Sequence, residues 1–209
     1  RDQPRSRGLG DVYKRQGYKD TETGDIIGFD IDIAKEVCSR LGIELKLQPI
    51  DWNNKQSELE NGNVDCLWNG FSKTPERDEQ FNLSIPYMKN EQIILVKTDS
   101  DYQTLEDLAG KTIGVQADSS TESALEAEEN KEFKDSLGEI VKIEDYAMAV
   151  LEIQNGTIDA ISIDEVVARF YLNNDPDAYR ILSDSDGNAL SLATEDYVCL
   201  LYTSDAADE

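Results

Sequence analysis

One stretch of the chain combines the residue types that bind a small carboxylate. The segment from Trp68 to Arg77 places glycine, serine and a single arginine at the end of an apolar run. Backbone N–H groups around Gly70 and the hydroxyl of Ser72 can donate hydrogen bonds, and the guanidinium of Arg77 can bind both oxygens of a carboxylate. These residues therefore predict a binding site for a small organic acid.

A second segment supplies the opposite charge. The apolar run from Ile158 to Ile163 ends in the carboxylates of Asp164 and Glu165. An arginine in one segment and an aspartate in the other match the two charges of an α-amino acid. Other roles remain open at this point: Asp164 can cap the helix that follows it, and Arg77 can pair with a neighbouring acid on the surface.

Apolar periodicity predicts the elements that must position these residues. The expected helices cover residues 29–41, 56–60, 104–110, 146–154 and 165–172, with another from 122, and the expected strands cover 44–50, 64–68, 91–97, 111–116, 140–143 and 158–163. Alternating strands and helices predict an α/β fold with largely parallel sheets. Ligands of such sheets bind beyond the carboxyl ends of the strands, where both candidate segments fall.

Charge and composition exclude several classes of function. The net charge is −24, from 20 basic and 44 acidic residues, so the chain repels nucleic acid and anionic lipid. Histidine is absent, which removes the usual general base and the usual zinc ligand. No metal-binding spacing occurs, and we expect no metal, no cofactor and no nucleic-acid partner. No apolar run approaches the roughly 20 residues that span a bilayer.

The two ends of the chain differ from the rest. Residues 1–16 carry five of the 20 basic residues without periodicity, and residues 198–209 interrupt an expected strand without a turn signal. We expect both to be adaptor-like, non-native segments joined to a truncated protein; frayed native termini are the alternative. Cys38 and Cys66 are expected to be buried small residues, with a disulfide between them left open.

The chain from about Gly17 to Tyr197 resembles the polar-amino-acid solute-binding proteins of bacterial ABC importers, extracellular solute-binding protein family 3. The run from Cys66 to Phe71 is most similar to the cystine and polar-amino-acid branch. The resemblance rests on six motifs in one order: Gly28–Ala34, Ile50–Trp52, Asn69–Arg77, Ser84–Tyr87, Ile113–Gln116 with Ser119-Ser120, and Asp159-Ala160 with Asp164-Glu165.

The resemblance implies a role for each motif residue. Arg77 would bind the α-carboxylate of the ligand, with help from Ser72 and the backbone at Ser120. The carboxylate of Asp164 and the carbonyl of Gly70 would bind the α-ammonium. Trp52 would pack on the ligand side chain, and Trp68 is a weaker candidate for the same role. Asp118 stands where the family has a glycine.

The resemblance also implies a two-lobed, periplasmic-binding-protein-like fold of type II that closes on its ligand by hinges near 97–101 and 193–197. We expect lobe 1, here incomplete, to cover residues 17–98, lobe 2 to cover 99–193, and a returning hinge strand to start at 194–197. The implied protein is an extracytoplasmic monomer, periplasmic or lipid-anchored, that delivers an amino acid to a membrane permease.

Two other functions remain on the same fold. One is a cyclohexadienyl-dehydratase-like enzyme, whose general acid would come from Asp51, Asp164, Glu165 or Lys73. The other is a sensor domain of a receptor or ligand-gated channel. Because the clamp residues contact only the constant part of an amino acid, the sequence leaves the identity of the ligand open.

Overall fold

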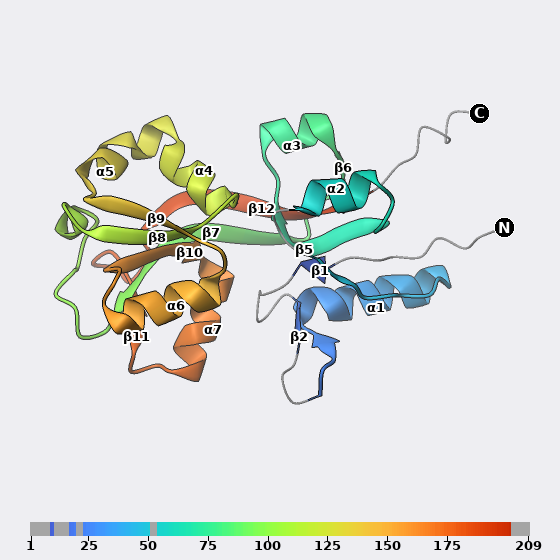
Figure 1. Cartoon of the computed structure of the whole chain (residues 1–209), viewed down its shortest axis with the longest axis horizontal. Helices are drawn as coiled ribbons and strands as arrows, with labels where there is room; N and C mark the ends of the chain where they lie inside the picture. The colour runs from blue at the N-terminus through green and yellow to red at the C-terminus, as the bar shows by residue number, and fades with distance from the viewer. Residues whose placement is uncertain (1–8, 11–16, 20–22, 51–53, 202–209) are drawn as a thin grey trace. The chain divides into compact units, whose positions relative to one another are not determined.

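The structure is a computed structural model that describes residues 9–10, 17–19, 23–50 and 54–201. The chain divides into two compact units (Figure 1). Unit 1 comprises residues 1–89 and 196–209, and unit 2 comprises residues 90–195. The chain passes between them twice, once within strand β7 (Met88–Lys97) and once within strand β12 (Ser191–Leu201).

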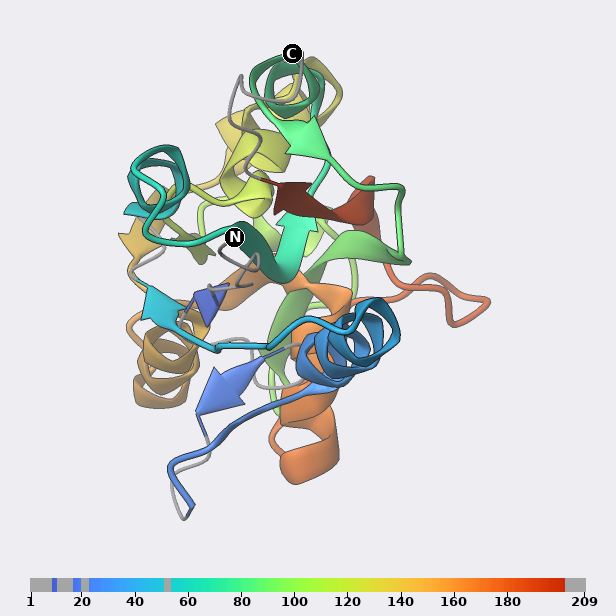
Figure 2. The ribbon, with the colours of Figure 1, turned by 90° about the vertical axis from the view of Figure 1, so that its right-hand side faces the viewer.

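Unit 1 is built around strand β5 (Cys66–Ser72), which pairs antiparallel with the last part of β12. Helix α1 (Phe29–Leu41) lies on one side of β5, and helices α2 (Lys55–Glu60) and α3 (Pro75–Gln80) lie on the other (Figures 1 and 2). Its short strands are β1 (Leu9–Gly10), β2 (Tyr18–Lys19), β3 (Ile26–Ile27), β4 (Pro49–Ile50) and β6 (Asn82–Leu83).

The core of unit 1 combines residues that lie far apart in the sequence. Leu67 and Phe71 of β5 pack with Leu59 of α2 and with Val198 and Leu200 of β12. The sequence analysis placed residues 198–201 in an adaptor-like segment. In the structure these four residues belong to β12, and the side chains of Val198 and Leu200 pack in the core beside β5, whereas Leu201 is exposed.

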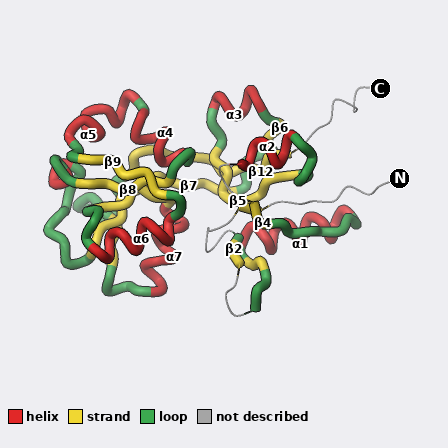
Figure 3. The backbone as a smooth tube through the Cα atoms, in the orientation of Figure 1, coloured by secondary structure: helices red, strands yellow, loops and turns green. Residues whose placement is uncertain are grey.

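Unit 2 is built on a mixed β-sheet. Strands β9 (Glu139–Ile143), β8 (Thr112–Gln116) and β10 (Ala160–Asp164) are parallel, and β7 pairs antiparallel with β10 and with β11 (Tyr179–Ile181). Helices α4 (Ser120–Glu126) and α5 (Lys131–Ser136) cover one face, and α6 (Tyr146–Asn155) and α7 (Glu165–Asn174) cover the other (Figure 3). Two 3-10 turns, η2 (Glu106–Leu108) and η3 (Glu128–Asn130), complete the unit.

Alternation along the strands decides which face each side chain joins. Ile94 and Val96 of β7, Ile113 and Val115 of β8 and Ala160 of β10 pack with Leu125 of α4 in one buried cluster. Residues two positions away on the same strands share this face. Gln92 and Asp164, which are register partners, therefore lie on the α4 side of the sheet.

The α/β class predicted from the sequence is confirmed, with differences in detail. The sheet of unit 2 gains antiparallel strands, and the described pairs around β5 are antiparallel. The expected strand 44–50 forms a ladder only at Pro49–Ile50, whereas the strand expected at 64–68 continues to Ser72. The helix expected over 104–110 is a single 3-10 turn. The boundary between units falls at 89/90 rather than at 98/99.

The structure adds three findings, on disulfides, on metal sites and on membrane-spanning helices. No disulfide joins Cys38 and Cys66, and both are buried, as is Cys199 of β12. Within the described ranges, no group of three or more acidic or cysteine side chains is arranged to hold a metal ion. None of the helices in these ranges has the length and apolar character needed to cross a membrane.

Candidate functional site

Arg77 is fixed at the end of β5 by contacts within unit 1. Helix α3 begins at Pro75, and the side chain of its N-cap, Thr74, accepts a hydrogen bond from the backbone N–H of Arg77 at 3.3 Å. The guanidinium Nη1 donates to the carbonyl of Ser72 at 2.7 Å, and Cζ lies 4.1 Å from the centre of the Phe71 ring. A backbone acceptor and an aromatic face thus orient the cation.

Gly70 adopts a backbone conformation that few other residues tolerate. Its φ is +58°, and it lies opposite the irregularity between Val198 and Leu200 in the β5–β12 ladder. Its N–H donates to Oδ2 of Asp30 at 3.1 Å and to the Tyr87 hydroxyl at 3.3 Å. This backbone N–H is thus used inside unit 1, whereas the resemblance assigned a role to the carbonyl of Gly70.

Asp30 is the acceptor at the centre of this arrangement. The Tyr87 hydroxyl donates to its Oδ2 at 3.0 Å, and the residue is fully buried. Burial raises the pKa of Asp30 to about 6, and the hydrogen bonds from Tyr87 and Gly70 only partly oppose this rise. Sequence reasoning missed this role, although Asp30 belongs to the first of the six motifs.

Of the two tryptophans predicted to contact the ligand, the structure describes only Trp68. Trp68 lies half-buried on β5 with its ring edge-on to Tyr87, at 6.0 Å between ring centres. Its indole N–H is buried and has no hydrogen-bond partner among the described residues. Such a donor is a candidate for a ligand contact, since buried N–H groups are rarely left unbonded. Trp52 lies outside the described residues.

Asp164 does not act as a helix cap. It occupies the N-cap position of α7, yet its side chain accepts no capping hydrogen bond. Its Oδ1 instead accepts from the side-chain amides of Asn90 at 2.6 Å and Gln92 at 2.8 Å, and its Oδ2 accepts from the Tyr146 hydroxyl at 3.2 Å. The residue is 5% exposed. Asn90, Gln92 and Tyr146 are thus among the groups that hold this carboxylate.

A wider polar network surrounds Asp164. The Gln92 amide donates to Oε2 of Glu195 at 2.8 Å and to the hydroxyl of Ser120 at 3.3 Å. The Ser120 hydroxyl donates to the same Glu195 oxygen at 3.2 Å. The Thr121 hydroxyl, which lies 2.9 Å from the Tyr146 hydroxyl, donates to Oε1 of Gln92 and so orients the amide.

Sequence reasoning placed Ser120 and Asp164 in the site but missed the residues that hold them. The missed residues are Asn90, Gln92, Thr121, Tyr146 and Glu195. One signal was available: Asn90 and Gln92 are polar residues two positions apart at the start of a strand that is otherwise apolar. The position of Glu195 depends on contacts more than 100 residues apart and has no local signature.

The loop before α4 is shaped for a helix start. Asp118 occupies the position at which the family named in the sequence analysis has glycine. Its φ is +54°, in the left-handed region that glycine adopts easily. Its N–H donates to Oε2 of Glu122 at 3.0 Å, and Ser119 caps α4 by accepting from the N–H of Glu122 at 3.3 Å. Aspartate therefore preserves the glycine-like turn that leads into α4 at Ser120.

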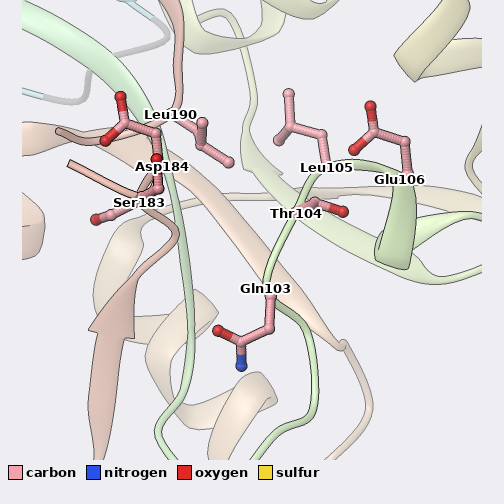
Figure 4. A pocket seen from close by; sticks show the side chains of 8 residues that line it. Gln103, Thr104, Leu105, Glu106, Ser183, Asp184 and Leu190 are labelled. Carbon is pink, nitrogen blue, oxygen red and sulfur yellow. The ribbon is translucent and has the colours of Figure 1, made fainter. Parts of the chain in front are cut away.

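A cavity of about 510 Å³ lies elsewhere in unit 2 (Figure 4). It is an open depression between two surface segments and holds none of the predicted ligand residues. Because no lysine or arginine lines it, it cannot supply the carboxylate clamp expected from the sequence. Its lining residues are Gln103, Thr104, Leu105, Glu106, Ser183, Asp184, Ser185 and Leu190.

Comparison with known proteins identifies similar chains. The family model for bacterial extracellular solute-binding proteins, family 3, matches residues 8–173. The arginine-binding extracellular protein ArtP of Bacillus subtilis is 35% identical over 168 residues, which cover 79% of this chain and 62% of ArtP. The L-cystine-binding protein TcyA of the same species is 25% identical over 162 residues, covering 77% and 57%. The chain spans about three fifths of the length of these relatives.

A solved structure shows the same arrangement of elements. It is an ABC uptake transporter substrate-binding protein from Streptococcus pneumoniae with bound histidine. It superposes with a TM-score of 0.85 at 33% identity, covering 97% of this chain and 81% of that one. Similarity at this level covers nearly the whole described chain rather than a single motif.

Proposed function

Because the chain belongs to the bacterial extracellular solute-binding proteins, family 3, we propose that it is the substrate-binding component of an ABC importer. It binds a free amino acid outside the cytoplasm and delivers it to a membrane permease. It carries out no chemical step on the ligand. ArtP, TcyA and the S. pneumoniae protein are all described as binding or uptake proteins, which supports this assignment.

The observation that carries the proposal is the state of Asp164. Aspartate at a helix N-cap normally bonds to the first free N–H groups of the helix. Here the carboxylate is buried and accepts hydrogen bonds from Asn90, Gln92 and Tyr146 instead of from the helix. A buried carboxylate at the start of a helix is the kind of group that pairs with the ammonium of an amino acid.

The remaining predicted residues complete the recognition of an α-amino acid. Arg77, oriented by Ser72 and Phe71, binds the α-carboxylate, with Ser72 and Ser120 as further contacts. The carbonyl of Gly70 joins Asp164 at the α-ammonium. Trp68, with its buried indole N–H that has no partner among the described residues, contacts the side chain of the ligand. Trp52, the other residue assigned to this contact from the sequence, lies outside the described residues.

The enzyme alternative receives less support from the same structure. Among its candidate acids, Lys73 pairs with Asp78 at 3.0 Å, and Glu165 pairs with Arg169 at 2.5 Å. Asp51 lies outside the described residues. Turnover of a prephenate-like substrate by the purified chain would favour the enzyme and contradict the binding role.

Calorimetric titration of the chain with free amino acids tests the proposal. We expect Arg77→Ala to weaken binding of every amino acid that binds by about 100-fold or more, since it removes a charge-assisted contact worth roughly 3 kcal/mol. Circular dichroism should show a folded variant. Arg40→Ala is the matched control, because Arg40 is an exposed arginine of unit 1 that pairs only within α1 among the described contacts. Equal affinities of Arg77→Ala and the unmodified chain would refute the assignment.

A further inference from the structure

The backbone of Gly70 is held by two side chains of unit 1. Its N–H donates to Oδ2 of Asp30 at 3.1 Å and to the Tyr87 hydroxyl at 3.3 Å. The Tyr87 hydroxyl donates to the same Oδ2 at 3.0 Å, so the three groups form a closed set of hydrogen bonds. These bonds fix the peptide plane before Gly70. Together with the unusual φ of +58°, they restrict the directions that the Gly70 carbonyl can take.

The carboxylate of Asp30 is a costly acceptor for this purpose. Asp30 is 0% exposed, and its other oxygen, Oδ1, is buried without a hydrogen-bond partner among the described residues. A buried charge with one unbonded oxygen destabilises the fold, whereas an asparagine would offer the Gly70 N–H an acceptor without a charge. A positive charge close to Asp30 would offset this cost.

The described titratable groups that face Asp30 supply no positive charge. They are the Tyr87 phenol and the Cys199 thiol of β12, which lies beside the Cys66 thiol of β5. Burial raises the pKa of Tyr87, and a hydrogen bond with the Cys66 thiol together with burial raises that of Cys199. Both groups are therefore neutral between pH 5 and pH 7, and Asp30 is the one of the three that changes its charge in this range.

We propose that Asp30 is a positioning residue for amino-acid binding, which acts through Gly70 and whose negative charge favours the bound state. This inference rests on the proposed function, in which the Gly70 carbonyl contacts the α-ammonium of the ligand. The ammonium then lies near Asp30, with one residue between them, and burial of the carboxylate limits the screening of their attraction by water. Because such coupling is reciprocal, the ligand favours charged Asp30 and charged Asp30 favours the ligand.

The sign of the resulting pH effect follows from this coupling. The pKa of Asp30 is about 6, so the residue is mostly neutral at pH 5 and mostly charged at pH 7. An ammonium that lowers this pKa by about one unit raises the affinity about fivefold between pH 5 and pH 7. An aspartate that only supports the fold is not coupled to the charge of the ligand and gives no such rise.

Calorimetric titrations at pH 5, 6 and 7 test the inference. The probes are free amino acids whose side chains keep their charge over this range, with L-arginine and L-glutamine first. We expect the affinity of the unmodified chain to rise about fivefold. Asp30→Asn keeps an acceptor for the Gly70 N–H but has no charge, so its affinity should stay constant and be about tenfold weaker than that of the unmodified chain at pH 7.

Two further variants separate positioning from folding. Tyr87→Phe removes one of the two hydrogen bonds that favour charged Asp30, so the midpoint of the rise in affinity should move to higher pH. A general loss of folding would not shift this midpoint, and circular dichroism checks that each variant is folded. Asp32→Asn is the matched control, because Asp32 lies in the same turn of α1 with an exposed side chain. It should keep the fivefold rise.

The outcomes for the inference and for the proposed function can be told apart. Amino-acid binding whose affinity does not rise with pH in the unmodified chain would overturn the inference and leave the proposed function standing. A rise that persists in Asp30→Asn would do the same. If none of these amino acids binds at any of the three pH values, the proposed function fails, and this inference fails with it.

Discussion

Asp30 lies in the first turn of α1, fully buried, with Gly70 and Tyr87 as donors to one of its oxygens. Its other oxygen, Oδ1, is buried and has no partner among the described residues. Two hydrogen bonds do not compensate for the loss of water around a charge, so the pKa rises from 3.8 to about 6. At the scale of the residue, burial thus makes one acid bind its proton more tightly than an exposed aspartate does.

This rise predicts a pH-dependent contribution to stability. Because the folded state binds the proton more tightly than the unfolded state, the contribution of Asp30 is fully present below pH 3.8 and is lost as the pH rises through about 6. The loss amounts to about 3 kcal/mol. The free energy of unfolding of the unmodified chain, minus that of Asp30→Asn, should fall by about 2 kcal/mol between pH 4 and pH 7 in urea titrations, since part of the loss lies outside this range.

Asp32→Asn provides the comparison for Asp30→Asn. Asp32 lies in the same turn of α1, but its side chain is 76% exposed and pairs with Lys35 at 3.5 Å. The difference in free energy of unfolding between the unmodified chain and Asp32→Asn should change little over the same pH range. If the difference in free energy of unfolding for Asp30→Asn also stays constant with pH, the prediction is wrong, and burial does not destabilise the charged form of Asp30.

At the scale of the element, two aspartates in equivalent positions have different roles. Asp145 is the N-cap of α6, and its side chain accepts from the N–H of Met148 at 2.8 Å. Asp164 is the N-cap of α7 without such a bond. The local sequence allows a cap at both positions. The difference arises because β10 places Asp164 opposite Gln92 of β7, whose amide competes for the carboxylate.

Replacing Asp145 tests this assignment. Asp145→Ala should lower the free energy of unfolding by about 1 kcal/mol, because it leaves an N–H of the first turn of α6 without a partner. Asp145→Asn keeps the acceptor and should be nearly neutral. Both values can be read from urea denaturation followed by circular dichroism. Similar losses in the two variants would indicate that charge, rather than the capping bond, is what stabilises α6.

At the scale of the whole molecule, the dominant property is a net charge of −24. Mutual repulsion among so many acids opposes the compact state, and salt screens it over a distance of about 10 Å at 0.1 M. The ion pairs among the described residues are mostly exposed, and each contributes little to stability. The dependence of the free energy of unfolding on ionic strength should therefore come mainly from this repulsion.

Raising NaCl from 20 to 500 mM at pH 7 should raise the midpoint of thermal unfolding. Each kcal/mol of relieved repulsion corresponds to about 2–4 °C for a chain of this size. The same titration near pH 4.2, the isoelectric point, should give almost no rise, since the net charge is then close to zero. An equal rise at both pH values would assign the effect to something other than charge screening.

The sequence by itself determined the order and type of most elements, because helix and strand periods, Gly42 and Gly156 as helix ends, and caps such as Ser119 act over a few residues. It also indicated Arg77, Ser72, Gly70, Ser120 and Asp164 as candidate ligand-binding residues, through motifs that are local in the chain, and that assignment stays a prediction. Short-range signals were weakest where tertiary packing sets the length of an element, as at β4, η2 and residues 198–201.

Only the tertiary structure decided what surrounds those residues. Gln92 and Asp164 are 72 residues apart, and Gln92 and Glu195 are 103 apart, so their contacts depend on strand register and on the return of β12. The same is true of Asp30, whose hydrogen bond to Gly70 spans 40 residues. A sequence shows which side chains can bear charge. The fold decides which of them share donors and lose water, and therefore how those charges are used.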